Sequence, residues 1–297
     1  MTELLQNCPV CQATAFTAFL ECTDYTVSKE RFKLQTCSAC GFVFTNPRPD
    51  AASIGAYYKS EDYISHTNSK KGLFNKVYQW ARHRAIRSKL NLLEEFKPSP
   101  RTLLDYGCGT GEFLSNAKKE GWKASGIEPD PEARSLAITN HQLEVKDPSQ
   151  LHTFSDGQFG AITLWHVLEH VHALNETIQQ FNRILSKDGV LFIAVPNHKS
   201  YDGKLYGEFW AGYDVPRHLY HFSKSSIENL MEKNGFAVKE IKPLFFDPFY
   251  IALLSEKYKN GSQNPLKATW VGLQTTLKGR SDMEANSSLI YIIRKRL

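Results

Sequence analysis

A short apolar strand that runs into a glycine-rich turn constrains this chain more than any other part of its sequence. Residues 103–114 read Leu-Leu-Asp-Tyr-Gly-Cys-Gly-Thr-Gly-Glu-Phe-Leu, with the acid at Asp105 and glycines at three alternate positions, Gly107, Gly109 and Gly111. Glycine adopts backbone angles that side chains forbid and lets a ligand approach the main chain, so this turn predicts a small-molecule cradle. The dinucleotide fingerprint G-x-G-x-x-G is excluded, because Glu112 stands three places after the second glycine.

The phase of these glycines resembles the first motif of the class I methyltransferases that use S-adenosylmethionine. The resemblance implies that Asp105 and the loop surround the methionine portion of the cofactor, and that an acid ending the next strand binds the ribose. Glu128 has that place, and a carboxylate can accept from both ribose hydroxyls at once. Asp147, after the third strand, has the place of a frequent adenine contact. The resemblance thus gives these cofactor residues: Asp105, Tyr106, Gly107, Cys108, Gly109, Gly111, Phe113, Glu128, Pro129, Asp147, Trp165 and His166.

From residue 101 onward, apolar strand patterns alternate with helical ones, which is typical of a parallel sheet covered by helices on both faces. The resemblance implies the seven-stranded Rossmann-like methyltransferase sheet of the α/β class, mostly parallel, with its last strand antiparallel. We expect strands near residues 101–106, 123–128, 143–147, 159–165, 189–196, 236–244 and 287–295.

Two helices between these strands have recognisable ends. An apolar face at every third or fourth residue, from Leu174 to Leu185, predicts a helix that ends at Asp188 and Gly189. The next helix is expected to begin with a capping box of Ser225 and Glu228 and to close at Gly235.

Four of the six cysteines form two C-x-x-C pairs near the N-terminus: Cys8, Cys11, Cys37 and Cys40. Each pair can supply two corners of a tetrahedron while the intervening chain folds back as a hairpin, so the spacing predicts a zinc site. Disulfides are the competing interpretation, but a chain that begins without a secretion signal is expected to stay in the cytoplasm with reduced thiols. Four thiolates leave no open position, so the zinc is expected to be structural, in a small N-terminal module resembling a zinc ribbon.

Composition changes mark three segments. Residues 1–45 are expected to form the zinc-binding module, 46–100 a linker with one or two cap helices, and 101–297 the methyltransferase domain. Lysines and arginines between residues 70 and 89 form a basic helix face, which is either solvated or a contact for phosphate.

The expected fourth strand runs into residues 164–171, at the carboxyl edge where open α/β sheets bind ligands. This segment resembles a motif of ubiquinone-pathway O-methyltransferases, in which a glutamate at the place of His166, with the residues matching Glu169 and His170, can hold a divalent ion. Histidine at this place disfavours magnesium, which prefers oxygen ligands. Glu169 and His170 are therefore either catalytic or part of a network that positions the loop. Trp165 and His166 are expected to flank the adenosine.

A long connection after the fifth strand, residues 197–222, is rich in Trp, Tyr, Arg and His. Connections of this length are more often functional than simple links, although a structural loop with stacked aromatics is the alternative. We expect it to lie over the methyl group of the cofactor. His218 or His221 is the candidate general base, Arg217 would orient an anionic substrate group, and His170 is a further catalytic candidate.

Together these features predict a methyltransferase that acts on oxygen or carbon of a small metabolite. Bacterial sugar C-methyltransferases also place a four-cysteine zinc module and a tyrosine-rich segment first, as residues 8–63 do here, so a sugar nucleotide is one candidate acceptor. No Asp-Pro-Pro or Asn-Pro-Pro motif follows the fourth strand, which disfavours methylation of exocyclic base nitrogens. No apolar run reaches the ~18 residues of a membrane-spanning helix, so no membrane partner is expected.

Two other functions remain open. A ribosomal RNA methyltransferase with a zinc module would use the basic helix to bind phosphates, and the net charge of +5 permits a nucleic-acid partner without requiring one. A non-catalytic zinc adaptor that keeps the cofactor pocket as a scaffold belongs to a different class. The acids at Asp105 and Glu128 favour a working cofactor site over that adaptor.

Overall fold

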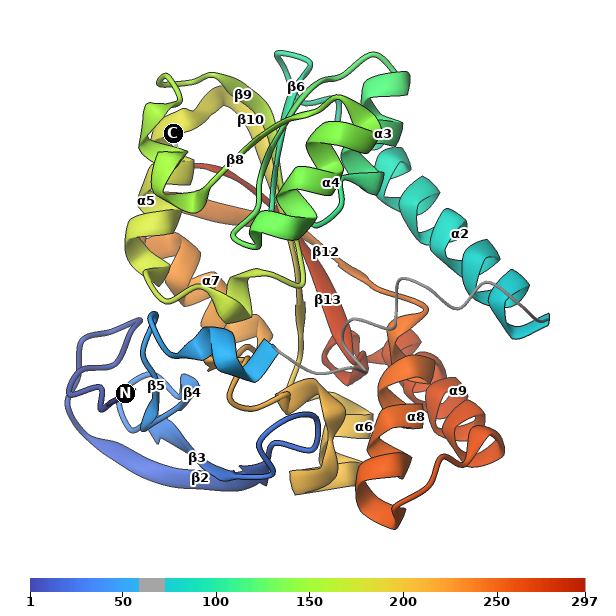
Figure 1. Ribbon diagram of the computed structural model, residues 1–297. Coiled ribbons are helices and arrows are strands. Elements are labelled where there is room, and N and C mark those ends of the chain that lie inside the picture. The colour runs from blue at the N-terminus through green and yellow to red at the C-terminus, as the bar shows by residue number, and fades with distance from the viewer. Residues whose placement is uncertain (59–72, 297) are drawn as a thin grey trace.

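The computed structural model describes residues 1–58 and 73–296, and its centre is a seven-stranded sheet (Figure 1). The strand order is β12-β13-β10-β9-β6-β7-β8. Strand β13 pairs antiparallel with both of its neighbours, and the other pairs in the sheet are parallel. The predicted fold class is therefore confirmed. The strands are β6 (Thr102–Tyr106), β7 (Lys123–Ile127), β8 (Glu144–Lys146), β9 (Phe159–Trp165), β10 (Leu185–Pro196), β12 (Phe236–Pro243) and β13 (Ser288–Lys295).

Alternation of side chains along the strands gives the sheet two buried faces. Leu191 and Ile193 of β10 pack in one core cluster with α5 and α7, whereas the intervening Phe192 packs in a second cluster with α2, α3 and α4. Period-two alternation between two apolar faces is expected for a sheet with helices on both sides. These helices are α2 (Leu73–Phe96), α3 (Glu112–Lys119), α4 (Pro131–His141), α5 (Leu174–Ile184) and α7 (Lys224–Lys233).

Two predicted helix ends are wrong by a few residues. Helix α5 ends at Ile184, because Leu185 already pairs with Phe159 as the first residue of β10. The cap of α7 is Ser223, which accepts from the backbone N–H of Ser226, so the predicted capping box lies two residues too late. In both cases the apolar pattern predicts the helix correctly. The pairing of Leu185 sets the end of α5, and the cap at Ser223 sets the start of α7.

The N-terminal region forms a second sheet of four antiparallel strands in the order β11-β4-β3-β2. Strands β2 (Phe16–Thr23) and β3 (Arg31–Cys37) are the hairpin expected between the cysteine pairs, and β4 (Val43–Thr45) follows. The fourth strand, β11 (Tyr220–His221), comes from the long loop after β10. A smaller sheet pairs β1 (Thr2–Glu3) with β5 (Arg48–Pro49).

Three further helices complete the part of the molecule below the main sheet in Figure 1: α6 (Tyr201–Tyr206), α8 (Asp247–Asn260) and α9 (Pro265–Ser281). The sequence pattern predicts the strands on either side but not helices α8 and α9, which lie between β12 and β13. Their inner faces pack with Phe32 and Leu34 of β3 and with Trp210 in a third core cluster. The 3-10 helices are η1 (Ile54–Tyr58), η2 (Pro148–Thr153), η3 (Leu168–His170), η4 (Gly207–Phe209), η5 (Ala211–Tyr213) and η6 (Met283–Ala285).

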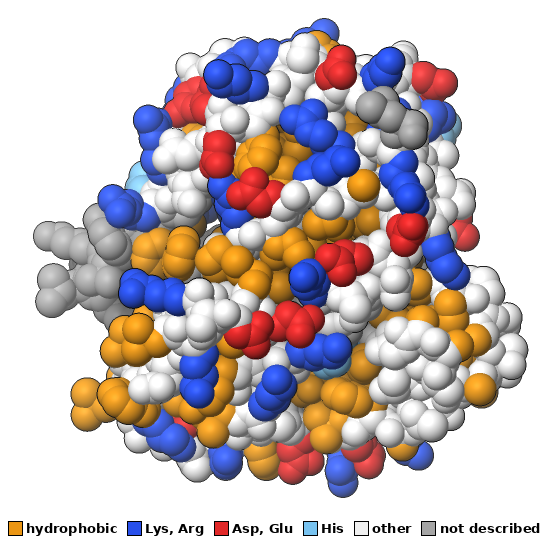
Figure 2. Space-filling model, turned by 180° about the vertical axis from the view of Figure 1, so that it is seen from behind, with side chains coloured by type: hydrophobic (Ala, Val, Ile, Leu, Met, Phe, Trp, Pro, Cys, Tyr) orange, Lys and Arg blue, Asp and Glu red, His pale blue; other side chains and the backbone are white. Residues whose placement is uncertain are grey.

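Helix α9 is apolar on its outer face as well. Figure 2 shows hydrophobic side chains gathered on the side of the molecule where α8 and α9 lie. The exposed large hydrophobic residues of α9 are Leu266, Trp270, Leu273 and Leu277. In the described part of the chain, no helix combines the length and the apolar character needed to cross a bilayer. Tyr63 of the tyrosine-rich segment, and Lys70 and Lys71 of the predicted basic helix face, lie outside the described residues. The division into three domains stays a prediction.

Candidate active site

The glycine turn connects β6 to α3 and has the geometry that its sequence predicts. All three glycines have positive φ values: 79° at Gly107, 54° at Gly109 and 82° at Gly111. A Cβ atom would meet Val167 at 2.4 Å from Gly107 and Leu143 at 2.6 Å from Gly111, so these two permit close packing. A Cβ on Gly109 would meet nothing within 4 Å, which leaves open space beside the main chain. The middle glycine is thus the one over which a ligand can approach.

Glu128 lies directly beside this turn. Its carboxylate accepts from the backbone N–H of Gly109 at 2.7 Å and from that of Asp130 at 3.0 Å. The side chain is buried, and burial raises the pKa of its carboxyl despite these two donors. A buried carboxylate at this edge can hold a pair of hydroxyls, as the resemblance implies for a ribose.

Asp105 ends β6 at the same edge and is almost fully buried. Its Oδ1 accepts from the hydroxyl of Thr163 at 2.6 Å. Burial raises the pKa of Asp105 to about 7, although the hydroxyl of Thr163 and the ammonium of Lys89 both oppose the rise. Lys89 reaches this site from α2, and its ammonium lies 4.7 Å from the ring centre of Trp165. Sequence reasoning assigned Lys89 only to a basic helix face, because nothing in the periodicity shows that it turns inward.

The other predicted cofactor residues surround this edge in different ways. The ring of Tyr106 packs edge-on against Phe181 in the core, so only its backbone faces the turn. Phe113 and Trp165 contact each other edge-on at 5.7 Å. Asp147 caps η2 and pairs with Arg134 at 3.3 Å. Cys108 is buried under the turn, and Pro129 is exposed.

The ring of His166, which the sequence predicts beside the adenosine, lies between two carboxylates. It follows β9 with a φ of 58°, and its Nε2 lies 2.9 Å from Oδ2 of Asp247 at the start of α8. Its Nδ1 lies 3.6 Å from Glu169 Oε1. Burial opposes a charge on this ring, yet Asp247 and Glu169 together raise the pKa of His166 to about 10. Asp247 is absent from the sequence prediction, because the pairing depends on how α8 folds against the end of β9.

Glu169, His170 and His218 form a cluster beyond His166, in which Glu169 and His218 are buried and His170 is half-buried. One ligand atom from each residue lies within 4.8 Å of the others, and the two imidazole rings meet edge-on at 4.7 Å. The Nε2 of His218 lies 3.9 Å from Glu169 Oε1. Burial and the neighbouring His218 lower the pKa of His170 to about 4, so its imidazole is neutral. Sequence reasoning named these three residues but had no means of showing that they meet.

The guanidinium of Arg217 binds protein groups rather than facing a substrate pocket. Its guanidinium donates to Asp214 from Nε at 3.0 Å and from an amino group at 2.7 Å. It also donates to Asp24 at 3.0 Å and to the carbonyl of Tyr57 at 2.9 Å. Because all three nitrogens already have protein acceptors and the residue is buried, Arg217 joins the N-terminal region to the loop instead of holding a substrate anion.

His221 also has a role in packing. Its ring is buried, and Nε2 lies 3.0 Å from the hydroxyl of Thr45 on the paired strand β4. That hydroxyl donates to the carbonyl of His218 at 2.9 Å, so it accepts from His221. Burial lowers the pKa of His221 well below its usual value. This geometry separates the two candidate bases: His218 faces the cluster, and His221 faces the second sheet.

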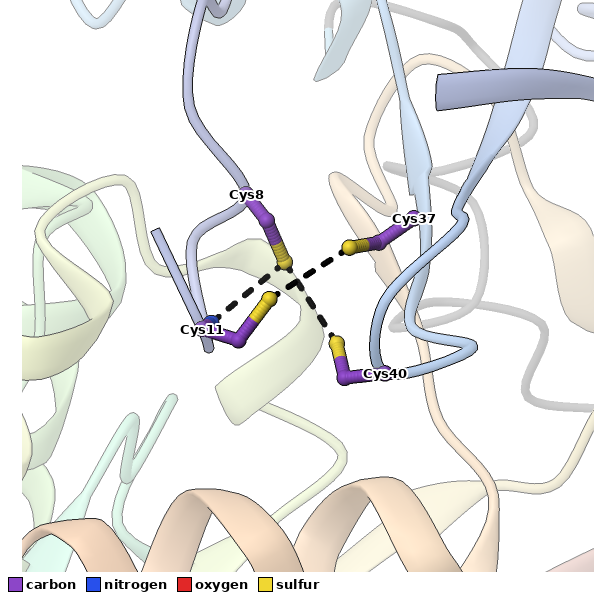
Figure 3. A group of neighbouring side chains, drawn as sticks. All are labelled: Cys8, Cys11, Cys37 and Cys40. Carbon is purple, nitrogen blue, oxygen red and sulfur yellow. Dashed lines mark hydrogen bonds between the residues drawn. The ribbon is translucent and has the colours of Figure 1, made fainter. Parts of the chain in front are cut away.

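The four predicted metal ligands converge at the other end of the N-terminal sheet (Figure 3). The Sγ atoms of Cys8 and Cys40 are 3.6 Å apart, and those of Cys11 and Cys37 are 3.4 Å apart. A zinc–sulfur bond of about 2.3 Å requires a tetrahedron edge of about 3.8 Å, so the arrangement fits the ion. Cys37 is the last residue of β3, and Cys40 lies in the turn between β3 and β4.

Comparisons with known proteins agree with this geometry. Residues 78–241, more than half of the chain, match the profile of a family described as "Methyltransferase domain". The ubiquinone biosynthesis O-methyltransferase of Glaesserella parasuis is 30% identical over 165 residues, which cover 50% of this chain and 70% of that protein. The mitochondrial enzyme of the same name from Rattus norvegicus is 27% identical over 166 residues, covering 50% of this chain and 47% of that protein. The chain thus matches about half the length of its mammalian relative.

Solved structures share the fold at lower identity. The magnesium protoporphyrin IX methyltransferase of Synechocystis PCC 6803, solved with bound SAH, superimposes with a TM-score of 0.54 at 12% identity and covers 84% of this chain and 100% of that one. A SAM-dependent methyltransferase from Archaeoglobus fulgidus gives 0.50 at 18% identity and covers 76% and 100%.

Proposed function

Because the chain belongs to the family of S-adenosylmethionine-dependent methyltransferases, we propose that it transfers a methyl group to an oxygen or an acidic carbon of a small metabolite. The observation that carries this proposal is the position of two sites along one edge of the sheet. The open space beside Gly109 and the carboxylate of Glu128 form a cofactor cradle. The cluster around Glu169 begins four residues after β9 ends, at the same edge of the sheet. A methyl group and an acceptor can therefore meet between the cradle and this cluster.

The proposed chemistry is an in-line displacement. The new bond joins the acceptor oxygen or carbon to the methyl carbon, and the methyl–sulfur bond breaks to leave neutral S-adenosylhomocysteine. A hydroxyl acceptor must also lose its proton, and the cluster of Glu169, His170 and His218 is where this loss would be assisted. Since the cofactor already carries its leaving group, the protein mainly has to align the acceptor and exclude water.

The structure gives less support to an RNA substrate. Of the basic side chains on the described part of α2, Arg82 lies 3.7 Å from Glu112 and Arg87 lies 2.7 Å from Glu120. Lys89 turns toward Asp105. Charges that already face acids contribute less to a phosphate-binding surface, so we favour a small molecule.

We further propose that the four cysteines hold a structural zinc ion. The donor set saturates a tetrahedral ion and leaves no open position. The first cysteine pair is held against the methyltransferase helices, because Asn175 of α5 donates to the carbonyl of Pro9 at 2.6 Å and Lys233 of α7 donates to that of Val10 at 3.0 Å. Zinc would therefore fix one end of the second sheet on the catalytic domain.

Methyl transfer from labelled S-adenosylmethionine tests the main proposal. The purified chain would be incubated with a small-molecule extract and, separately, with total RNA. We expect the label in a low-molecular-mass product that survives ribonuclease, and at least a tenfold lower rate for His218→Ala, as is typical for loss of a group that assists proton transfer. The exposed His152→Ala is the matched control. Label that enters RNA and disappears with ribonuclease would contradict the proposal.

A further inference from the structure

Helix α9 has apolar side chains on two opposite faces. Its buried face packs on the protein and contains Ala268, Val271, Gly272, Thr275 and Gly279. At about 100° per residue, its four large exposed apolar residues lie together on the other side, within an arc of about 60°. These four residues form the outer stripe: Leu266, Trp270, Leu273 and Leu277, with exposed fractions of 87%, 62%, 45% and 54%. Single exposed side chains need no explanation, but a continuous stripe indicates a contact surface.

Close packing prevents α9 from turning this stripe inward. A Cβ atom on Gly272 would meet the ring of Phe249 at 2.6 Å, so α8 and α9 are in direct contact at that level. Near the end of α9, Gly279 packs against Asn286, whose amide donates to the carbonyl of Gly279 at 3.3 Å. Figure 1 shows α9 at the edge of the molecule, beyond α8. The outer stripe therefore faces away from the rest of the described chain.

The outer stripe has the spacing of a surface that pairs with another helix. Its residues are separated by four, three and four positions, which is the a/d pattern of a heptad. This order is the same when it is read from either end. An antiparallel helix of the same sequence can therefore place its Leu277 opposite Leu266 and its Leu273 opposite Trp270, with a two-fold axis between the helices.

The threonines that border the outer stripe are already hydrogen-bonded within their own helix. The hydroxyl of Thr269 donates to the carbonyl of Pro265 at 2.8 Å. The hydroxyl of Thr276 donates to the carbonyl of Gly272, also at 2.8 Å. Because buried hydroxyls need a hydrogen-bond partner, a second protein surface can cover these two without leaving them unpaired.

The charges beside the outer stripe permit pairing with an identical helix. In the antiparallel arrangement, Thr269 faces Thr276 of the second copy along one border. Along the other border, Lys267 faces Gln274 of the second copy. No like charges meet at these positions, so the stripe is compatible with its own copy.

A lipid surface fits the outer stripe less well. Helices that lie in a membrane interface have a strongly charged face opposite the apolar one, whereas the opposite face of α9 is buried in the protein. Two of the three basic residues of α9 also have partners within the chain. Lys267 lies 2.8 Å from Glu256, and the ammonium of Lys278 lies 4.7 Å from the ring centre of Tyr201. Cations that are already paired attract an anionic bilayer less strongly.

We propose that the outer stripe binds the same stripe of a second copy of this chain, in an antiparallel and two-fold symmetric pair of α9 helices. Trp270 lies near the centre of this pair, where large aromatic side chains contribute most to binding. Both copies present the same surface, so the contact closes on itself and gives a dimer instead of a filament. The pairing is independent of the proposed methyl transfer, because the outer stripe shares no residue with the cofactor cradle or with the cluster around Glu169.

Sedimentation equilibrium of the full chain tests the dimer. We expect a mass that approaches twice the chain mass of 33.8 kDa as the protein concentration rises. Trp270→Glu should weaken the association at least ~30-fold, as is typical for loss of a central aromatic anchor. Leu136→Glu is the matched control, because it places the same charge on an apolar residue of α4 that is 44% exposed. Circular dichroism and urea unfolding show whether each variant keeps its fold.

The charge at position 274 tests the antiparallel order. Gln274→Glu places a carboxylate opposite Lys267 of the second copy, so the dimer should become about 2–5-fold tighter. Gln274→Lys should weaken the dimer by a similar factor, because it places two cations opposite each other. On a lipid surface the two signs would be reversed, since the added lysine would attract anionic vesicles and the glutamate would be repelled.

A wild-type chain that stays monomeric would overturn the proposal. So would equal association of the wild type and folded Trp270→Glu, or charge variants whose effects on the dimer have the opposite signs. Sedimentation with vesicles of phosphatidylcholine and phosphatidylglycerol identifies the alternative occupant. Vesicle binding by a monomeric wild type that Trp270→Glu abolishes would show that the outer stripe binds lipid instead.

Discussion

At the scale of single residues, backbone angle and burial explain why the cofactor edge has its sequence. Gly107 and Gly111 are required by positive φ and by close neighbours, whereas Gly109 is required by positive φ and faces open space. Asp105 is unusual because its carboxyl group, at the end of β6, is buried inside the protein. Burial favours the protonated form of such a group. Its ionisation should therefore be coupled to folding.

We predict that Asp105 makes the protein less stable as the pH rises from about 4 to about 7. The unfolded carboxyl loses its proton near 3.8, whereas burial raises the pKa in the folded protein to about 7, so folding takes up a proton in this interval. The cost approaches about 4 kcal/mol at the upper end, at ~1.4 kcal/mol per pKa unit. Asp105→Asn, which can still accept from Thr163, should remove this slope.

The measurement is the free energy of unfolding in urea at pH 5 and pH 8 for both proteins. The wild type should lose stability relative to the asparagine variant between these two values. Parallel pH profiles would show that Asp105 is not coupled to folding.

At the scale of elements, a strand of two residues connects the two halves of the site. Strand β11 leaves the long loop and pairs with β4, so His218 is positioned by the second sheet. The hydroxyl of Thr45 is the central contact, because it donates to the carbonyl of His218 and accepts from the ring of His221. Both partners are buried. The length and composition of the loop predicted its functional importance, but not this pairing.

Thr45→Val should test the importance of this strand pairing. The variant keeps the shape of the side chain but leaves a buried carbonyl and a buried ring N–H without partners, which costs about 1–3 kcal/mol of unfolding free energy. Urea denaturation measures this loss, and exposed Thr139→Val on α4 should change it by less than ~0.5 kcal/mol. Methyl transfer should fall more than affinity for S-adenosylhomocysteine, because His218 moves and Glu128 does not. Equal stabilities for wild type and Thr45→Val would contradict this account.

At the scale of the whole molecule, the N-terminal region and the catalytic domain share their supporting contacts. The cysteine end is held by Asn175 and Lys233, and the opposite end is held by the buried pair of Asp24 and Arg217. The second sheet therefore lies on the catalytic domain at two places. The cofactor cradle depends on β6, β7 and α3, which belong to the main sheet alone.

Removal of the proposed zinc ion should therefore affect methyl transfer and cofactor binding differently. With Cys37→Ser, or after treatment with a strong chelator, we expect affinity for S-adenosylhomocysteine to change by less than ~3-fold, below ~0.7 kcal/mol. Methyl transfer should fall at least ~10-fold, since β11 and His218 lose their support. Calorimetry and the labelled-methyl assay measure the two quantities. The buried but isolated Cys22→Ser is the control for loss of a thiol. A parallel loss of both quantities would show that the zinc region supports the whole fold.

The sequence by itself determined the features that depend on local backbone chemistry and on periodicity. Alternating apolar runs predicted the seven strands, the phase of three glycines predicted the turn beside Gly109, and the spacing of four cysteines predicted their cluster. Only the tertiary structure decided which polar side chains meet at the acceptor side. Asp24, Asp247 and His218 reach their partners across long sequence separations, and such contacts leave no periodic signal. They are set by how α8, β11 and the second sheet pack against the carboxyl edge of the main sheet, and burial there decides which charges are paired.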